Sequence, residues 1–442
     1  MRFNEKKFYE LAKENGFEAA DLIFDHSFSL SVSVFHNEVD SFTESDSYGV
    51  SARGIINGKF GTASTEEINK DTPEVLINGI KETARLIEKE EKGEIFKGSE
   101  KYHKKNVYNP NTITGDISKK IEILKQIEAK LRAYDKRIVE VATVGYDESL
   151  DESVLSNSYG LKLKDKKATC TYYAEVAAQD GNDMKTGFHV FASLNQEDFN
   201  IDEFVKEVAE DALKKIGAIQ CKSKKYPTVL NPETASSLLS AYLSNIDAEE
   251  VQKGSSMFCG KLHQSIASKK LTVIENPLLK NFFFTYHDDE GVAAIKKTII
   301  NKGVLETYIY TLETAKKDGV APTGNGYRAG KVRAGLSQVV VKPGKKSEEE
   351  IFSKIKEGVY ITSLEGLHAG LNPKSGNFSL QAQGFMIKDG KLAEPLTLIT
   401  VAGNLKDVFN DVKEVANNSK LNIRNGYTIP SMLIKKMAIS GK

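Results

Sequence analysis

The 442-residue chain contains no tryptophan, only three cysteines and no excess of either charge. Cys170, Cys221 and Cys259 are widely spaced and form no C-x-x-C pair, so the sequence indicates neither a disulfide framework nor a cysteine zinc knuckle. Lysine plus arginine and aspartate plus glutamate each total 61, so no net field attracts nucleic acid or an anionic membrane. Because no apolar run reaches the roughly 18 residues of a membrane span, we expect a cytoplasmic protein that does not enter a membrane.

Several catalytic patterns are also missing. The seven histidines are scattered, and none has a histidine partner one helical turn away, the economical arrangement for zinc on a helix. No G-x-S-x-G motif of a serine hydrolase occurs. Gly324, Gly326 and Gly330 form G-x-G-x-x-x-G, but neither a G-K-[ST] motif nor a clear helix follows, so we interpret this segment as a tight turn or a close backbone contact.

What the chain does contain is a repeated order of elements. Its 40% hydrophobic and 28% charged residues are typical of a soluble globular protein, and its length suggests about two to four domains. The first hundred residues predict a helix over 4–15, strands over 22–35 and 48–56, and a second helix over 73–87. Thr72 is the predicted cap of the second helix. The same order recurs further on: 117–133, strands within 138–190, and 201–216.

A short motif accompanies this recurrence. Residues 45–49 read SDSYG, and residues 156–160 read SNSYG. We infer two degenerate copies of one unit, about residues 1–100 and 116–222, joined by a polar, turn-rich linker over 97–116. Chance similarity of a turn is the alternative explanation of the five-residue match.

The second half is dominated by strand patterns. A basic segment over 222–227 predicts a linker, and Asn231 precedes a helix that carries a broad apolar face. Ser347 and Glu350 form a capping box that predicts a short helix. The predicted strands follow the chain as 271–274, 281–286, 292–300, 304–311, 384–388, 391–394 and 396–401.

These patterns predict an α+β fold. We expect two similar small α/β units in the amino-terminal half, residues 1–222. A β-rich carboxyl-terminal domain with a large mixed or antiparallel sheet follows over residues 223–442.

The strongest candidate site lies within residues 282–328, where an aromatic run leads into an acidic turn and then a glycine-rich loop. The turn consists of a histidine, three carboxylates and a glycine: His287, Asp288, Asp289, Glu290 and Gly291. Three carboxylates beside an imidazole could bind a metal ion or share acid and base roles. The same residues could equally form an ordinary turn whose side chains cap backbone N–H groups.

The second half resembles the TldD/PmbA family, whose members are also called modulators of DNA gyrase. The motifs that carry the resemblance occur in the family's order: KGSSMF (253–258), GKL (260–262), LTV (271–273), DDEG (288–291), KGVL (302–305), TGNG (323–326), NPKSG (372–376), AGNL (402–405), PSMLI (430–434) and ISG (439–441). The resemblance covers residues 226–442 with distinctive motifs and the rest of the chain more loosely.

The resemblance implies a function class. The family contains two related subunits that together form a zinc metallopeptidase acting on unfolded peptides. Its catalytic TldD type carries H-E-x-x-x-H on a helix before the K-G-x-S segment, and a cysteine ligand near the carboxyl end. Here the corresponding helix, residues 238–245, reads LLSAYLSN, and the closing segment, residues 424–430, lacks the cysteine. The resemblance therefore implies the PmbA/TldE type, with no catalytic residue and no cofactor in this chain and with zinc expected in a TldD-type partner.

The implied partners are a TldD-type metallopeptidase subunit and an unfolded peptide, in a dimer without membrane or nucleic acid. Exposed sheet edges could hold an extended peptide through main-chain hydrogen bonds. The resemblance implies that seven residues of the family motifs shape a chamber or a subunit interface and take no part in catalysis: Asp288, Asp289, Glu290, Gly291, Gly324, Asn325 and Gly326. His287 is then an incidental neighbour.

Two other functions stay open at this point. One is a self-sufficient hydrolase that uses the cluster from His287 to Glu290. The other is a binding module associated with DNA gyrase, which the family's historical name suggests and the zero net charge disfavours.

Overall fold

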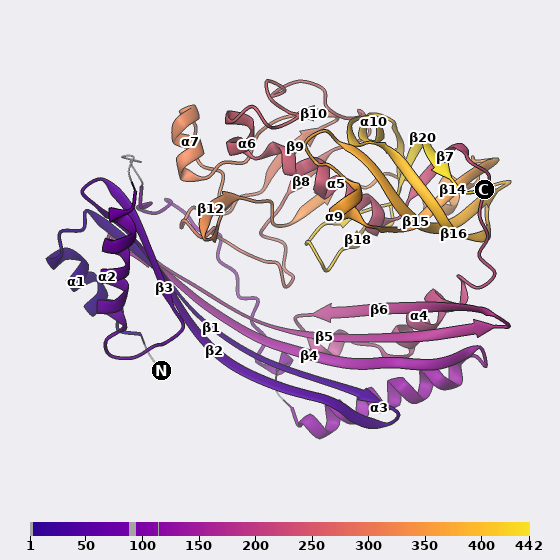
Figure 1. Cartoon of the computed structure of the whole chain (residues 1–442), viewed down its shortest axis with the longest axis horizontal. Coiled ribbons are helices and arrows are strands. Elements are labelled where there is room, and N and C mark those ends of the chain that lie inside the picture. The colour runs from indigo at the N-terminus through magenta and orange to yellow at the C-terminus, as the bar shows by residue number, and fades with distance from the viewer. Residues whose placement is uncertain (1–2, 88–93, 114) are drawn as a thin grey trace.

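The computed structural model describes residues 3–87, 94–113 and 115–442. An arched amino-terminal sheet lies along one side of a β-rich carboxyl-terminal domain (Figure 1). Within the described residues, no helix is both long and apolar enough to cross a membrane.

The amino-terminal half consists of two units with the same order of elements, helix, three antiparallel strands and helix. The first unit comprises α1 (Glu5–Glu14), β1 (Ala19–Phe35), β2 (Glu38–Ile56), β3 (Lys59–Thr65) and α2 (Thr72–Arg85). The second comprises α3 (Ile117–Tyr134), β4 (Ile138–Asn157), β5 (Lys162–Asp180), β6 (Asp183–Ser193) and α4 (Ile201–Leu213). The predicted duplication is therefore confirmed.

The two units share one six-stranded sheet in the order β3-β2-β1-β4-β5-β6. Its central pair, β1 and β4, is antiparallel and joins one unit to the other. The helices cover opposite ends of the arch (Figure 1). Leu76 and Ile80 of α2 pack with Leu22 at one end, and Leu124 of α3 packs with Val144 at the other. Each pair of helices thus covers its own core, and β1 contributes to both, with Leu22 in one and Leu30 in the other.

The SDSYG echo does not mark equivalent places, although the duplication is real. Residues 45–49 lie inside β2. Residues 156–160 instead span the end of β4 and the turn after it. The order of the elements carries the repeat, and the five-residue match is coincidental.

The start of α2 also differs from the prediction. Its N-cap is Asp71, and Thr72 is already helical. The Thr72 hydroxyl accepts a hydrogen bond from the Asn69 N–H at 2.7 Å, which closes the preceding turn. Val75, expected on the apolar stripe, is 57% exposed, because α2 turns Leu76 and Ile80 towards the sheet instead.

The connector between the units contains a single short 3-10 turn, η1 (Pro110–Thr112), in its described part. Many of its described residues are exposed, but it is anchored at a few points to the carboxyl-terminal domain. Val107 is buried in a cluster with Phe284 and Tyr286 of the carboxyl-terminal domain. The Tyr102 hydroxyl donates to the Gly291 carbonyl at 2.7 Å. The predicted linker therefore helps to join the two halves of the molecule.

The carboxyl-terminal domain contains two large sheets. Its helices are α5 (Pro232–Leu243), α6 (Ala248–Gln252), α7 (Leu312–Asp318), α8 (Glu348–Phe352), α9 (Leu367–Gly370) and α10 (Leu405–Asn410), with a short 3-10 turn at η3 (Ser244–Ile246). Another 3-10 turn, η2 (Gln196–Asp198), lies between β6 and α4 in the amino-terminal half. Its strands are β7 (Lys224–Leu230), β8 (Val273–Glu275), β9 (Lys297–Asn301), β10 (Val304–Leu305), β11 (Gly326–Ala329), β12 (Lys331–Ala334), β13 (Val339–Val341), β14 (Glu357–Glu365), β15 (Asn377–Lys388), β16 (Lys391–Asn404), β17 (Val412–Val415), β18 (Lys420–Leu421), β19 (Thr428–Ile429) and β20 (Met432–Ser440).

One sheet has the order β10-β9-β8-β13-β19-β18 and the other β16-β15-β14-β7-β20-β17, while β11 and β12 form a separate hairpin. Each large sheet has one parallel pair, so both are mixed. Helix α5 contacts both sheets, and its Leu238, Leu239 and Tyr242 are fully buried. The predicted α+β class, with a β-rich second half, is confirmed.

Three local predictions in this domain are wrong. The strand predicted over 304–311 is limited to β10, Val304–Leu305. The basic segment over 222–227 is not a free linker, because Lys224–Leu230 forms β7 in the middle of a sheet. Pro227 is tolerated there because it faces an irregularity in β20 between Ile434 and Met437, where no ladder donor is needed. Residues 281–286 form no strand but irregular turns that pack against the other half of the molecule. The predicted capping box of Ser347 and Glu350 is present.

Candidate functional site

The acidic turn lies where the two halves of the chain meet, and Asp288 organises it. One carboxylate oxygen, Oδ1, accepts hydrogen bonds from the Glu290 N–H at 3.0 Å and the Val292 N–H at 2.9 Å. The other, Oδ2, accepts from the Gly326 N–H at 2.8 Å. Asp288 therefore caps backbone donors, as the structural alternative predicted, and joins the turn to β11.

The neighbouring carboxylates make similar contacts. Asp289 Oδ2 accepts from the Arg328 N–H at 2.7 Å. Glu290 Oε2 accepts from the Leu312 N–H at the start of α7, at 2.9 Å. The structure thus brings Asp288, Asp289 and Glu290 together as acceptors for main-chain donors.

Glycine is required at two positions of the adjoining loop. Gly324 has a φ of +69°, and a Cβ there would lie 2.5 Å from the Ala293 carbonyl oxygen. A Cβ on Gly326 would lie 2.6 Å from Glu290 Oε2. The glycine-rich loop is therefore a close backbone approach, as predicted. Gly291 also has a positive φ.

Asn325 takes part in a separate buried group. Its Nδ2 donates to Glu275 Oε1 at 2.8 Å and to the Gly335 carbonyl at 2.9 Å. Lys297 Nζ donates to Asn325 Oδ1 at 3.0 Å and pairs with Glu275 at 2.5 Å. Asn325 thus links the loop to β8 and β9 rather than to the acidic turn.

Burial sets the protonation of the turn. It raises the pKa of Asp288 to about 7, and the nearby Glu290 carboxylate adds to the rise. Burial also raises the pKa of Glu290. For His287, burial alone would lower the pKa, but the pairing with Asp165 outweighs it and the pKa is raised.

A buried ion-pair group crosses the boundary beside this turn. Asp21 of β1, 2% exposed, accepts from Arg53 Nη2 of β2 at 2.5 Å and from Arg328 Nη2 of β11 at 2.7 Å. Arg53 Nη1 also lies 4.0 Å from Glu290 Oε1. Burial would raise the pKa of Asp21, but the two guanidinium groups outweigh it and the pKa is lowered. The amino-terminal sheet and the acidic turn are therefore electrostatically joined.

The interpretation of His287 as an incidental neighbour is wrong. Its Nε2 lies 2.6 Å from Asp165 Oδ2 of β5, and its Nδ1 lies 2.8 Å from the Asp288 carbonyl oxygen. Beside it, the Tyr286 hydroxyl donates to the Lys164 carbonyl and accepts from the Lys164 N–H, both at 2.9 Å. Residues 281–286 form no strand because their backbone N–H groups bond locally, as those of Phe284 and Thr285 do to the carbonyls of Asn281 and Pro277.

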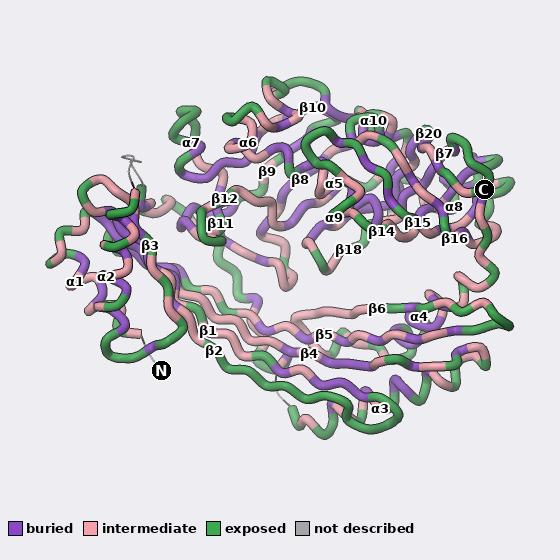
Figure 2. Tube along the Cα trace, in the orientation of Figure 1, coloured by how far each residue is buried: buried purple, intermediate pink, exposed green. Residues whose placement is uncertain are grey.

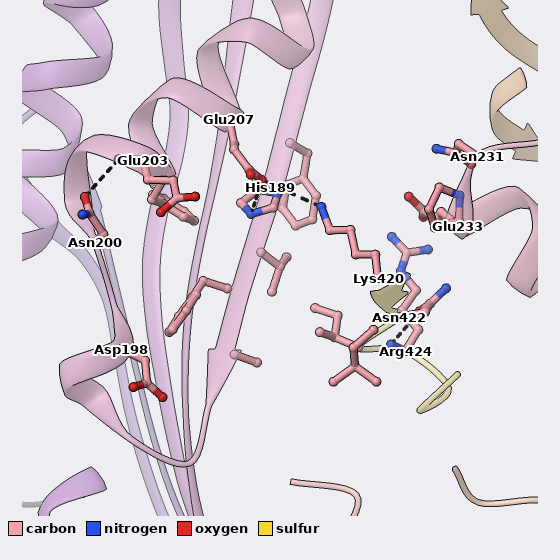
Figure 3. A pocket seen from close by; sticks show the side chains of 18 residues that line it. His189, Asp198, Asn200, Glu203, Glu207, Asn231, Glu233, Lys420, Asn422 and Arg424 are labelled. Carbon is pink, nitrogen blue, oxygen red and sulfur yellow. Dashed lines mark hydrogen bonds and ion pairs between the residues drawn. The ribbon is translucent and has the colours of Figure 1, made fainter. Parts of the chain in front are cut away.

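A cleft of about 560 Å³ separates the two halves further along (Figure 3). One wall consists of β6 and α4, and the other of the start of α5 and residues 420–424. His189 Nε2 lies 2.9 Å from Glu207 Oε2, and Lys420 Nζ lies 3.9 Å from the same oxygen. Burial lowers the pKa of His189. Sequence reasoning missed this cleft because residues 420–424 follow the wall of β6 and α4 by more than 200 residues in the chain.

The helix that the resemblance matches to the TldD zinc helix is α5. It lies against residues 422–427, which overlap residues 424–430, the closing segment in which the resemblance places the TldD cysteine. Ser236 Oγ accepts hydrogen bonds from Asn425 Nδ2 at 3.0 Å and from Asn422 Nδ2 at 3.3 Å. We call these three residues the Ser236 network. Among the described residues, no group of three or more His, Cys, Asp or Glu side chains is placed to hold a metal ion.

The fold is that of a two-part α+β protein in which helix α5 contacts two mixed sheets. At the site, α5 meets residues 422–427 through the neutral side chains of the Ser236 network. Three family models match the chain: PmbA/TldA metallopeptidase domain 1 over residues 20–89, the central domain over 115–216, and the C-terminal domain over 223–441. The chain belongs to the PmbA/TldD metallopeptidase family.

Individual relatives agree with this assignment. The Metalloprotease MJ0996 of Methanocaldococcus jannaschii is 24% identical over 430 residues, with 93% of each chain covered. A Metalloprotease PmbA homolog of Buchnera aphidicola is 28% identical, with 70% of this chain and 67% of the relative covered. The crystal structure of TM0727 of Thermotoga maritima, named as a modulator of a DNA gyrase, has a TM-score of 0.90 at 28% identity and covers 99% of both chains.

Proposed function

We propose that this chain is a non-catalytic PmbA/TldE-type subunit of a TldD/TldE-type zinc metallopeptidase that processes unfolded peptides. The observation that carries the proposal is the Ser236 network, which occupies the contact between α5 and residues 422–427. Zinc sites in proteins are built from thiolate, imidazole and carboxylate ligands. A hydroxyl and two amides offer none of these, so zinc would be held by a TldD-type partner.

The cleft supports a role in holding peptide. Strand β6 is the outermost strand of its sheet. Its Phe188 N–H points away from β5 and donates to Asp211 Oδ2 at 3.1 Å. Since backbone direction alternates along a strand, Val190 and Ala192 direct their backbone groups the same way, into the cleft that they line. Such an edge can bind an extended peptide by strand addition with little demand on its sequence.

The hydrolase alternative receives little support from the geometry. Oxygens of Asp288 and Glu290 accept backbone N–H groups, and both side chains are buried between the two halves. A substrate carbonyl would have to displace contacts that hold the turn together. A role with DNA gyrase rests on the name of relatives such as TM0727, and the balanced charge of this chain does not favour DNA binding.

Co-expression with a TldD-type chain tests the proposal. We expect a complex by size-exclusion chromatography with light scattering, zinc only when the TldD-type chain is present, and cleavage of an unfolded peptide by the complex. The matched control replaces the Glu of the partner's H-E-x-x-x-H helix with Gln, which should abolish cleavage and leave the complex intact.

Two results would contradict the proposal. One is stoichiometric zinc with peptide cleavage by this chain alone. The other is the absence of any complex, with the activity of the TldD-type chain unchanged by this one. Tight, salt-dependent DNA binding would instead support the gyrase-related alternative.

A further inference from the structure

The long hairpin of β1 and β2 leaves one edge of the amino-terminal sheet open. Strand β3 pairs with β2 only from Val50↔Thr65 to Ile56↔Lys59. Among the described strands, residues 38–49 of β2 therefore have β1 as their single neighbour. Residues 38–47 are exposed throughout, the green run along β2 in Figure 2. At about 3.3 Å per residue, the open edge is roughly 40 Å long.

The backbone groups of this edge can be assigned. The Ile55 carbonyl accepts from the Glu18 N–H, on the side of β2 that faces β1. Because direction alternates along a strand, odd-numbered residues of β2 point towards β1 and even-numbered residues point outwards. The irregularity in the ladder lies at Asp40, opposite the Ser33/Val34 step, so the alternation holds from residue 41 onwards. Phe42, Glu44 and Asp46 therefore present their N–H and C=O groups to solvent.

The side chains of the same edge are strongly acidic. Residues 38–47 contain Glu38, Asp40, Glu44 and Asp46 and neither lysine nor arginine. Glu44 and Asp46 share one face with Phe42, which is 51% exposed. Asp46 Oδ1 lies 2.6 Å from His26 Nε2, while no such contact holds Glu44 in the described structure. In a chain of zero net charge, four acidic residues within ten make a local field of one sign.

The acidic side chains determine which kind of strand can pair with the open edge of β2. A second copy of this chain, added antiparallel along the same edge, would place acidic side chains opposite acidic side chains, which destabilises a strand pair. A strand with lysine or arginine at alternate positions would place opposite charges across from Glu44 and Asp46. An apolar residue on that strand would cover Phe42.

We propose that the open edge of β2, residues 41–49, is a docking site for a basic strand of a partner protein. The partner extends the sheet through main-chain hydrogen bonds, and its alternating cationic side chains select this edge over the others. The proposal rests on the geometry and charge of β2 alone and stands independently of the function proposed above.

Binding of synthetic strands to the full chain tests the docking site. The probe is a fluorescent ten-residue peptide that alternates lysine and threonine, with a glutamate-threonine peptide as the charge control. A lysine-threonine peptide N-methylated at alternate residues controls for the main-chain hydrogen bonds. We expect anisotropy changes with the first peptide only, weakening as salt is raised, and slowed hydrogen exchange confined to residues 38–49.

Variants at Glu44 sharpen the test, because its side chain is exposed and its replacement should leave the fold intact. Glu44→Lys should weaken lysine-peptide binding about fivefold or more, and Glu44→Gln by a smaller factor. Glu44→Pro removes an outward N–H group and should also weaken binding of the lysine-threonine peptide. Glu82→Lys, at an exposed acid on α2, is the matched control and should leave binding unchanged.

Three outcomes would overturn the proposal. Equal binding of the lysine and glutamate peptides would remove the charge argument. Protection at the β6 edge instead of residues 38–49 would assign the binding to the cleft. Self-association of this chain that Glu44→Lys alters would identify the occupant as a second copy.

Discussion

The acidic turn and the Ser236 network are both polar contacts that join segments far apart in the chain, and they differ in charge. At the turn, carboxylates and guanidinium groups are buried together between the two halves, with Asp21 paired to Arg53 and Arg328. At the network, one hydroxyl and two amides meet without any formal charge. An unpaired buried charge is far more costly than an unpaired hydroxyl. Substitutions at the acidic turn and its ion pairs should therefore lower the free energy of unfolding strongly, whereas substitutions in the Ser236 network should change it little.

Removing the central carboxylate of the ion-pair group should have the largest effect. Asp21→Ala leaves Arg53 and Arg328 buried without their shared partner. We expect a loss of about 3–5 kcal/mol in the free energy of unfolding, measured by urea denaturation. The exposed Glu66→Ala serves as control and should change stability by less than about 0.5 kcal/mol. A loss for Asp21→Ala as small as that of the control would remove the distinction between the two regions.

Asp288→Asn should have the next largest effect. Asp288 accepts three backbone N–H groups through two oxygens. The asparagine amide keeps one acceptor oxygen and turns an NH₂ group towards a donor, so we expect a loss of about 1–3 kcal/mol. The zinc content of a co-expressed complex should stay the same. Loss of zinc with fold and assembly intact would instead show that the turn is a metal site.

The raised pKa of Asp288 predicts a pH dependence of stability. The folded state holds this proton up to a pH of about 7, whereas the unfolded state releases it near the ordinary value of 3.8. Between these values the unfolded state binds fewer protons, so the group's contribution to the free energy of unfolding falls as pH rises and levels off above about 7.

Wild-type protein should therefore lose stability relative to Asp288→Asn across that window, as followed by denaturation at a series of pH values. The lowered pKa of Asp21 acts with the opposite sign, at pH below its ordinary 3.8, so the two carboxylates can be told apart. The prediction would be contradicted if the difference in free energy of unfolding between wild type and Asp288→Asn did not change between pH 4 and 7.

Ser236→Ala should have the smallest effect. It removes one acceptor from Asn422 and Asn425, and loss of a neutral hydrogen bond costs about 1 kcal/mol. Assembly with a TldD-type chain, zinc content and peptide cleavage should be unchanged. A marked loss of cleavage would show that the network contributes to catalysis after all.

Local signals predicted much of the fold. The capping box of Ser347 and Glu350 and the apolar face of α5 depend on residues within a few positions of each other, and both are present. Residues 281–286 have the composition of a strand, yet Tyr286 bonds to Lys164 across the domain boundary. The local pattern could not anticipate that contact.

The same limit applied to the site. The sequence singled out Asp288, Asp289 and Glu290 and allowed for a turn that caps backbone groups. Arg53, whose guanidinium lies 4.0 Å from the Glu290 carboxylate, is more than 200 residues away in sequence. No local signal marks Ser236 either, since its role depends on a segment that follows nearly 190 residues later.

The central seam of the arched sheet, from Asp21↔Asn157 to Val34↔Val144, joins the first strand of one unit to the first strand of the other. Antiparallel contact between equivalent strands is how two identical molecules meet across a two-fold axis. The seam therefore has the geometry of a two-fold interface within one polypeptide. Without the second unit, β1 would keep β2 on one side and expose its other edge over these residues.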